Sequence, residues 1–171
     1  MALITSTKNL KMKKILLINN GYPSKINGQY AAYIKSIREC LEISGQSVDV
    51  LVMYADFKVG KFPKILAYLK YYLKLLSFPD YKKYDYVYIN NYPHSFLPLI
   101  FRLKYFNKLI IHWHGADIFA ERFHNKILNR ISYIFIPQDC RHIAPSKYFA
   151  NSISKALNLK VEDVFISASG G

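Results

Sequence analysis

The sequence has few of the residues that mark several protein classes. It contains only two cysteines, Cys40 and Cys140, which lie far apart, so we expect reduced thiols in a cytoplasmic protein and no disulfide framework. No apolar run approaches the roughly 18 residues that span a bilayer. Residues 1–11 lack the features of a signal peptide. We interpret 1–11 as a flexible tail, with Met12 as an alternative start, and 12–171 as one domain.

Acidic residues are also scarce. Eleven Asp and Glu against 24 Lys and Arg give a net charge of +13, which favours anionic partners such as nucleic acid, anionic lipid or a nucleotide-linked substrate. The basic residues form no recognition helix and no RNA-binding strand motif, so nucleic acid is the least favoured of the three. Apolar residues make up 51% of the chain, which is typical of a globular domain with a sizeable core.

Strand patterns alternate with helical patterns along the chain. Apolar runs predict strands at 14–19, 47–54, 85–91, 108–114, 141–146 and 163–169. Helical spacing predicts helices at 27–45, 57–79, 95–104, 121–132 and 147–157. Because the strands are apolar on both faces, this alternation predicts an α/β fold, a single doubly wound parallel sheet with helices on both faces.

Polar side chains follow the ends of several predicted strands. Parallel strands end at a common edge, and ligands bind to such sheets at the carboxyl ends of the strands. At these ends the sequence places Asn19, Asn20, Asn90, Asn91, His94, His112, His114, Gly115, Asp117 and Ser146. We therefore expect a binding site at this edge.

The segment 110–119 leads from an apolar strand into two histidines, a glycine and an aspartate. Histidine can transfer protons near neutral pH, and a carboxylate can orient the imidazole or bind a hydroxyl group. For His112, inside the strand, a structural role is favoured. His114 and Asp117 occupy the turn itself and are candidate catalytic residues. The histidine and cysteine spacings do not indicate a zinc site, so no metal is predicted.

The loop after the first strand contains glycines but lacks the GxGxxG spacing of dinucleotide-binding loops. Its glycines could simply form turns. Alternatively, Gly28 could let a ligand phosphate approach the amides of the following helix, whose amino end favours anions. Gly28 and Gln29 are therefore candidate phosphate contacts.

The segment 57–79 contains five lysines and no acidic residue. Its apolar residues recur at helical spacing. One interpretation is a helix that packs on the sheet and leaves its lysines in water. The other places the basic surface against an anionic membrane, where each lysine contributes about 1 kcal/mol. The lysines of that surface are Lys61, Lys64, Lys70 and Lys74.

The order of these motifs resembles the amino-terminal, acceptor-side domain of family 4 glycosyltransferases with the GT-B fold. A strand, a loop with proline and glycine, and a helix ending at glycine open both patterns, here at 14–52. The HGAD sequence at 114–117 matches a later strand end, Ser146 opens a helix after the next strand, and the last strand runs into glycine. The resemblance covers nearly all of 12–171 and implies a Rossmann-like sheet.

The resemblance implies transfer of a sugar from a nucleotide-sugar to a glycan or lipid-linked acceptor in cell-surface polysaccharide synthesis. Gly28 would lie near the donor phosphates, and His114 would hydrogen-bond the transferred sugar. The implied acceptor pocket, shaped also by Asp117, contains Asn20, Asn91, His94 and Ser146. Such enzymes bind the donor mainly through a second domain that has no counterpart in this sequence. We therefore expect no cofactor besides the nucleotide-sugar co-substrate, and no activity without a separately encoded donor-binding half.

The resemblance also suits a location on the inner face of the cytoplasmic membrane, where many relatives act. Two alternatives stay open. One is a noncatalytic membrane-surface or assembly module, a truncated remnant of such an enzyme. The other is a free-standing nucleotide-binding domain, which would bind a nucleotide-sugar by itself.

Overall fold

The computed structural model describes residues 11–25, 28–54, 61–90, 92–119 and 123–167. Its strands are β1 (Lys14–Asn19), β2 (Ser47–Val52), β3 (Tyr86–Asn90), β4 (Leu109–His112), β5 (Arg141–Ala144) and β6 (Val164–Ile166). The α-helices are α1 (Ala32–Ile43), α2 (Lys61–Ser77), α3 (Gly115–Ile118), α4 (Phe123–Ile134) and α5 (Lys147–Leu157). Short 3-10 helices are η1 (Tyr81–Lys83), η2 (Leu97–Tyr105) and η3 (Val161–Asp163).

The six strands form one parallel sheet in the order β2-β1-β3-β4-β5-β6. The predicted single α/β domain with a Rossmann-like sheet is therefore confirmed. From β1 the chain moves to β2 at one edge, and from β3 onward it moves toward the other edge. Right-handed crossovers in opposite directions place their helices on opposite faces of the sheet. The winding thus reverses between the neighbouring strands β1 and β3.

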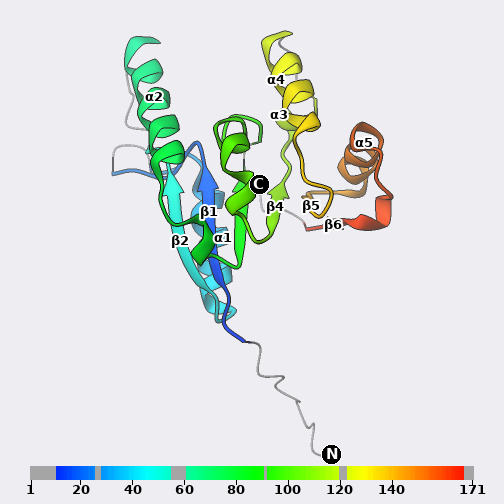
Figure 1. Ribbon diagram of the computed structural model, residues 1–171, viewed down its shortest axis with the longest axis horizontal. Helices are drawn as coiled ribbons and strands as arrows, with labels where there is room; N and C mark the ends of the chain where they lie inside the picture. Colours follow the sequence, from blue (N-terminus) through cyan, green and yellow to red (C-terminus); the bar gives the residue numbers. More distant parts are fainter. Residues whose placement is uncertain (1–10, 26–27, 55–60, 91, 120–122, 168–171) are drawn as a thin grey trace, which may run out of the picture.

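The two faces of the sheet are covered unequally. On one face α1 packs through Ile34 against strand residues such as Leu17 and Tyr88. On the other face α2 and η2 contribute Tyr71 and Leu99, among others, to a larger cluster that also includes residues of α5. Figure 1 shows α2, α4 and α5 spread along the sheet, with α2 and α4 extending beyond the carboxyl ends of the strands.

Some element boundaries differ from the predictions. The first helix was expected from residue 27, but α1 begins at Ala32 because Ala31 has a left-handed backbone, with φ of 53°. Gly45, with φ of 82°, follows the end of α1 as predicted. The segment expected to be a helix at 95–104 is instead a run of 3-10 turns at Leu97–Tyr105.

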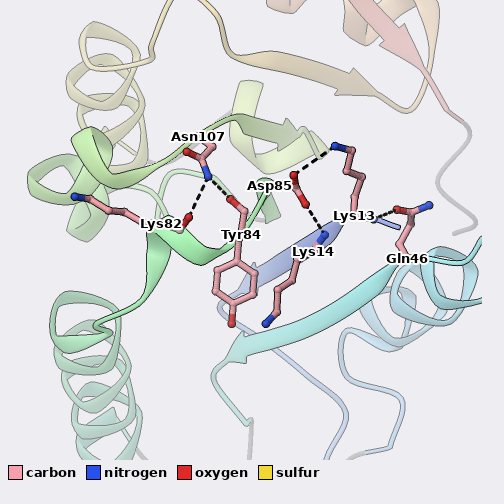
Figure 2. A network of polar contacts seen from close by, with 7 residues as sticks. All are labelled: Lys13, Lys14, Gln46, Lys82, Tyr84, Asp85 and Asn107. Atoms are coloured by element: carbon pink, nitrogen blue, oxygen red, sulfur yellow. Dashed lines mark hydrogen bonds and ion pairs between the residues drawn. The ribbon is translucent and has the colours of Figure 1, made fainter. Parts of the chain in front are cut away.

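The amino ends of the central strands are held by side chains that bond to the backbone (Figure 2). The Asp85 carboxylate accepts the backbone amide of Lys14 at 2.8 Å and the ammonium group of Lys13 at 3.4 Å. The Gln46 side chain accepts the backbone amide of Lys13 at 2.8 Å. These contacts join β1 to the segments that lead into β2 and β3.

Asn107 completes this amino edge of the sheet (Figure 2). Its side-chain amide donates to the backbone carbonyls of Tyr84 at 2.7 Å and Lys82 at 3.1 Å. One side chain thereby ties the segment before β4 to the segment before β3. At the amino edge, these polar side chains therefore have hydrogen-bond partners and stabilise the sheet.

Candidate functional site

The carboxyl edge of the sheet contains the point where the winding reverses. The chain leaves β1 toward α1 on one face, and it leaves β3 toward η2 on the other face. In open α/β sheets a crevice forms between two strands whose connections diverge in this way, and ligands bind there. Asn19 ends β1 and Asn90 ends β3, so both lie at this point. The structure therefore places several of the predicted polar residues around the switch point.

A cluster of polar and aromatic side chains lies on the α1 side of this edge. The rings of His112 and His114 stack with centroids 4.8 Å apart. The His114 ring also lies 4.9 Å from the ring of Tyr33 in α1. His114 Nε2 is 3.4 Å from Asn90 Oδ1, and because an amide oxygen only accepts, this assigns the proton to Nε2. His114 therefore connects β3, β4 and α1.

Burial keeps both histidines of this cluster neutral near pH 7. It lowers the pKa of His112 to about 4, with a smaller contribution from the charge that His114 can carry. Burial also lowers the pKa of His114 below its ordinary value. A neutral imidazole can donate and accept hydrogen bonds without bringing a buried charge. The pair is thus suited to bind neutral polar groups.

His112 is almost fully buried, as its predicted structural role requires. The hydroxyl of Tyr88 lies 2.9 Å from its Nδ1. When the hydroxyl donates to Nδ1, the ring proton of the neutral imidazole lies on Nε2. That Nε2 atom has no hydrogen-bond partner among the residues that the structure describes. His112 is therefore both a core residue and a source of unused hydrogen-bonding capacity.

Asp117 is buried within α3, the short helix that follows β4. Its carboxylate accepts the backbone amide of His114 at 2.9 Å. Its backbone carbonyl accepts the side-chain amide of Asn129 at 2.6 Å and the hydroxyl of Tyr133 at 3.0 Å. Burial raises the pKa of Asp117 well above its ordinary value, and the bond from the His114 amide opposes this rise. These contacts favour a positioning role for Asp117, while a direct catalytic role stays a prediction.

Four buried polar atoms at this edge lack partners within the described residues: Asn19 Oδ1, Asn20 Oδ1, Asn90 Nδ2 and His112 Nε2. Asn90 and His112 are direct neighbours in the β3–β4 register. Leaving a buried polar atom unbonded costs about 1–3 kcal/mol, so most such atoms in proteins have partners. The four atoms include acceptors and donors, and a ligand with hydroxyl groups could satisfy both kinds.

A second cluster lies at the same edge on the α2 side. The side-chain amide of Asn20 donates to the hydroxyl of Tyr68 at 3.2 Å. The Tyr68 ring lies 5.9 Å from the ring of His94. Two predicted acceptor residues are thus brought together by a tyrosine of α2 that sequence reasoning did not select. They stand on the opposite side of the sheet plane from His114.

The predicted phosphate contacts Gly28 and Gln29 lie exposed in the turn before α1. A Cβ atom at Gly28 would meet only the Ser24 carbonyl oxygen, at 4.0 Å, so this turn is open to a side chain or a ligand. Gly21 is the more crowded of the two glycines. A Cβ atom there would lie 2.6 Å from Cε1 of Tyr30. The phosphate role of Gly28 stays a prediction.

The remaining predicted site residues are more dispersed. Ser146 follows β5 and caps α5 by accepting the amide of Phe149 at 3.4 Å. Asn91 lies outside the described residues. Lys61 opens α2, and exposed positions along the same helix hold Lys64, Lys70 and Lys74.

Sequence reasoning missed Tyr33. Its helical spacing assigned it to the apolar face of α1, yet it faces His114 at the start of that helix. Burial, followed by the charge of Asp117, raises the pKa of Tyr33 to about 12. The signal that could have identified it is a tyrosine in the first turn of the helix that follows β1, where ligands are bound in such folds.

Within the described ranges, no group of three His, Cys, Asp or Glu residues lies close enough to hold a metal ion. Cys140 and His142, for example, are both buried, and His142 Nδ1 accepts the indole N–H of Trp113 at 3.1 Å. In the comparisons with known proteins, no family model and no curated protein matches the chain.

Proposed function

We propose that this chain is the acceptor-binding half of a glycosyltransferase, which moves a sugar from a nucleotide-sugar to a glycan or lipid-linked acceptor in cell-surface polysaccharide synthesis. The observation that carries the proposal is the group of buried polar side chains at the switch point, whose donor and acceptor atoms lack partners among the described residues. Sugar hydroxyls both donate and accept, so they match these atoms. The resemblance of the motif order to family 4 enzymes supports the same function.

In this proposal, His114 forms a hydrogen bond with the transferred sugar, and Asp117 holds the turn that orients His114. Asn20 and His94 contact the acceptor on the α2 side, with Asn91 and Ser146 as further acceptor residues. Gly28 and Gln29 lie by the donor phosphates, which the net charge of +13 attracts. A donor-binding domain supplies the rest of the nucleotide-sugar site.

The proposal predicts that the chain alone binds glycan acceptors measurably and nucleotide-sugars weakly. Titration calorimetry with both ligand classes tests this. If the isolated chain binds a nucleotide-sugar tightly and no acceptor, the free-standing nucleotide-binding alternative replaces the acceptor-half proposal.

His114 is the residue whose replacement tests the mechanism. In a mixture of the chain, a donor-binding domain and a nucleotide-sugar, we expect His114→Ala to lower turnover about 100-fold, because removing one transition-state hydrogen bond at a preorganised site costs this much. Ser152→Ala is a suitable control, because its exposed hydroxyl bonds only to its own helix, at 3.1 Å. Equal turnover of the His114 variant and the wild type would remove His114 from the mechanism.

A second proposed function is that of a membrane-surface module, with or without catalysis, on the inner face of the cytoplasmic membrane. None of the described helices is long and apolar enough to cross a bilayer. A specific observation favours contact with the membrane surface, because the lysines of α2 flank apolar side chains that are exposed instead of buried. This peripheral location does not depend on sugar transfer.

A further inference from the structure

The outward face of α2 is apolar. Tyr71 and Leu75 point inward and are buried in the core below the helix. On the opposite face a stripe at helical spacing is exposed, and Phe62 at its start is 76% exposed. The stripe consists of Phe62, Ile65, Leu69 and Leu73. A surface helix normally turns a polar face to solvent, so this stripe lacks a partner among the described residues.

Helix α4 repeats this arrangement in a more extreme form. Its inner face is polar, because Asn129 and Ser132 are buried there and Asn129 anchors the helix to the Asp117 carbonyl. Its apolar stripe therefore faces outward, and Phe123 is 77% exposed. The stripe consists of Phe123, Ile127, Ile131 and Ile134. Large apolar groups on a surface mark interaction sites.

The charges beside both stripes have one sign. Helices α2 and α4 contain no Asp or Glu. Lys70 and Lys74 line a groove of about 450 Å³ that also touches Leu66. Lys126 and Arg130 line a groove of about 420 Å³ beside the α4 stripe. Each helix thus pairs an exposed apolar stripe with cations, which is the pattern of helices that lie in a membrane interface.

The two helices lie on the same side of the molecule. Residues of α2 and Tyr133 of α4 pack on the same face of the sheet. Figure 1 shows that the amino-terminal halves of both helices extend beyond the carboxyl ends of the strands. Phe62 and Phe123 belong to these projecting halves. A flat surface approaching from that side meets both helices.

We propose that α2 and α4 together dock this domain on an anionic phospholipid bilayer. The two apolar stripes enter the boundary between headgroups and acyl chains, and the four cations of the grooves contact lipid phosphates. The occupant follows from charge complementarity, because every ionised side chain of the two helices is positive. The proposal extends the membrane contact of the proposed function and is independent of sugar transfer.

Vesicle flotation of the whole chain tests the proposal. We expect flotation with phosphatidylglycerol-containing vesicles and little flotation with pure phosphatidylcholine, and we expect weaker binding as salt rises because salt screens exposed charges. Replacing Lys70 and Lys74 by Gln should weaken binding about thirtyfold, and the Lys126→Gln and Arg130→Gln pair should act similarly. A matched control is the pair Lys155→Gln and Lys160→Gln, which removes two exposed lysines outside both helices.

The apolar stripes have their own test. Phe62→Ser and Phe123→Ser should each weaken binding about tenfold or more, because an inserted phenyl ring leaves water. Phe165→Ser is the control, since Phe165 is exposed on β6 at the sheet face that carries α1. All these positions are exposed, so unchanged thermal unfolding is expected.

Three results would overturn the docking proposal. One is absence of flotation with anionic vesicles at physiological salt. Another is an equal loss of binding in the control variants, which would mean unspecific attraction by net charge. The third is a dimer in solution that Phe62→Ser dissociates without any vesicle binding, which would assign the stripes to a second copy of the chain.

Discussion

The polar side chains at the two edges of the sheet differ in whether they have hydrogen-bond partners. At the amino edge Asp85 and Asn107 each make two hydrogen bonds to neighbouring groups. At the carboxyl edge Asn90 and His112 keep atoms that lack partners among the described residues. Both edges belong to the same strands, so strand chemistry does not explain the difference. One edge uses its polar groups for stability, and the other has the unused hydrogen-bonding capacity that the proposed ligand site requires.

The two carboxylates that cap backbone amides show the same contrast. Asp85 accepts the Lys14 amide while largely in contact with solvent, and this hydrogen bond lowers its pKa. Asp117 accepts the His114 amide inside the protein, and burial raises its pKa despite that bond. The same kind of hydrogen bond thus accompanies a lowered pKa in Asp85 and a raised pKa in Asp117, because only Asp117 is buried. Titratable groups with strongly shifted pKa values are typical of functional sites.

The largest effect that we expect from this comparison is loss of stability in acid. Burial lowers the pKa values of His112 and His142 to about 4, from an ordinary value of 6.5. The unfolded chain then binds more protons between these pH values, so each histidine costs roughly 3 kcal/mol of stability when the pH falls to 4. Asp117 acts in the opposite sense, because its raised pKa adds stability on acidification.

Urea unfolding between pH 7 and pH 4 measures this dependence. His112→Gln should flatten the loss of unfolding free energy in acid, because it removes one buried titrating group. Asp117→Asn should make the loss steeper, because it removes the opposing contribution. Parallel curves for the wild type and both variants would show that these groups do not titrate as buried residues.

The next effect is at the amino edge, where Asn107→Leu keeps the side-chain shape but removes two hydrogen bonds. We expect a loss of about 1–3 kcal/mol in unfolding free energy, because two backbone carbonyls lose their donor. Acceptor affinity, measured by calorimetry, should not change. If the fully folded variant bound the acceptor more weakly, the amino edge would also contribute to ligand binding, which contradicts the comparison of the two edges.

The smallest stability effect is expected for the matched substitution at the carboxyl edge, Asn90→Leu. Asn90 Nδ2 has no partner within the described part of the chain, and Asn90 Oδ1 accepts the long hydrogen bond from His114 Nε2 at 3.4 Å, so the substitution should lower unfolding free energy by about 1 kcal/mol. Acceptor affinity should instead fall about tenfold, as for the loss of one ligand hydrogen bond. A large loss of stability with normal ligand binding would show that Asn90 is a structural residue.

Much of the fold could be predicted from local patterns. The bounds of β1 and α5 and the role of Gly45 follow from an apolar run, helical spacing and a turn residue. The gathering of polar residues at one edge follows from parallel strands alone. The late start of α1 could not be predicted, because the left-handed backbone of Ala31 has no signal in an alanine.

The site was less predictable because its properties depend on distances between elements. The contact of Tyr33 with His114 joins α1 to the end of β4, which no local pattern encodes. Helix α4 is a further example. Periodicity identifies an apolar stripe, but the stripe faces outward because Asn129 bonds to the Asp117 carbonyl. Only tertiary structure shows which side of an amphipathic helix faces the protein.

The reversal of winding between β1 and β3 has a consequence for how this domain can change. The reversal is produced by the paths of two connections, so it does not depend on any one side chain at the strand ends. The side chains at these strand ends can therefore be exchanged while the scaffold stays intact. Under the proposed function, a mutational library confined to the ends of β1, β3 and β4 is the place to select for binding of other sugars.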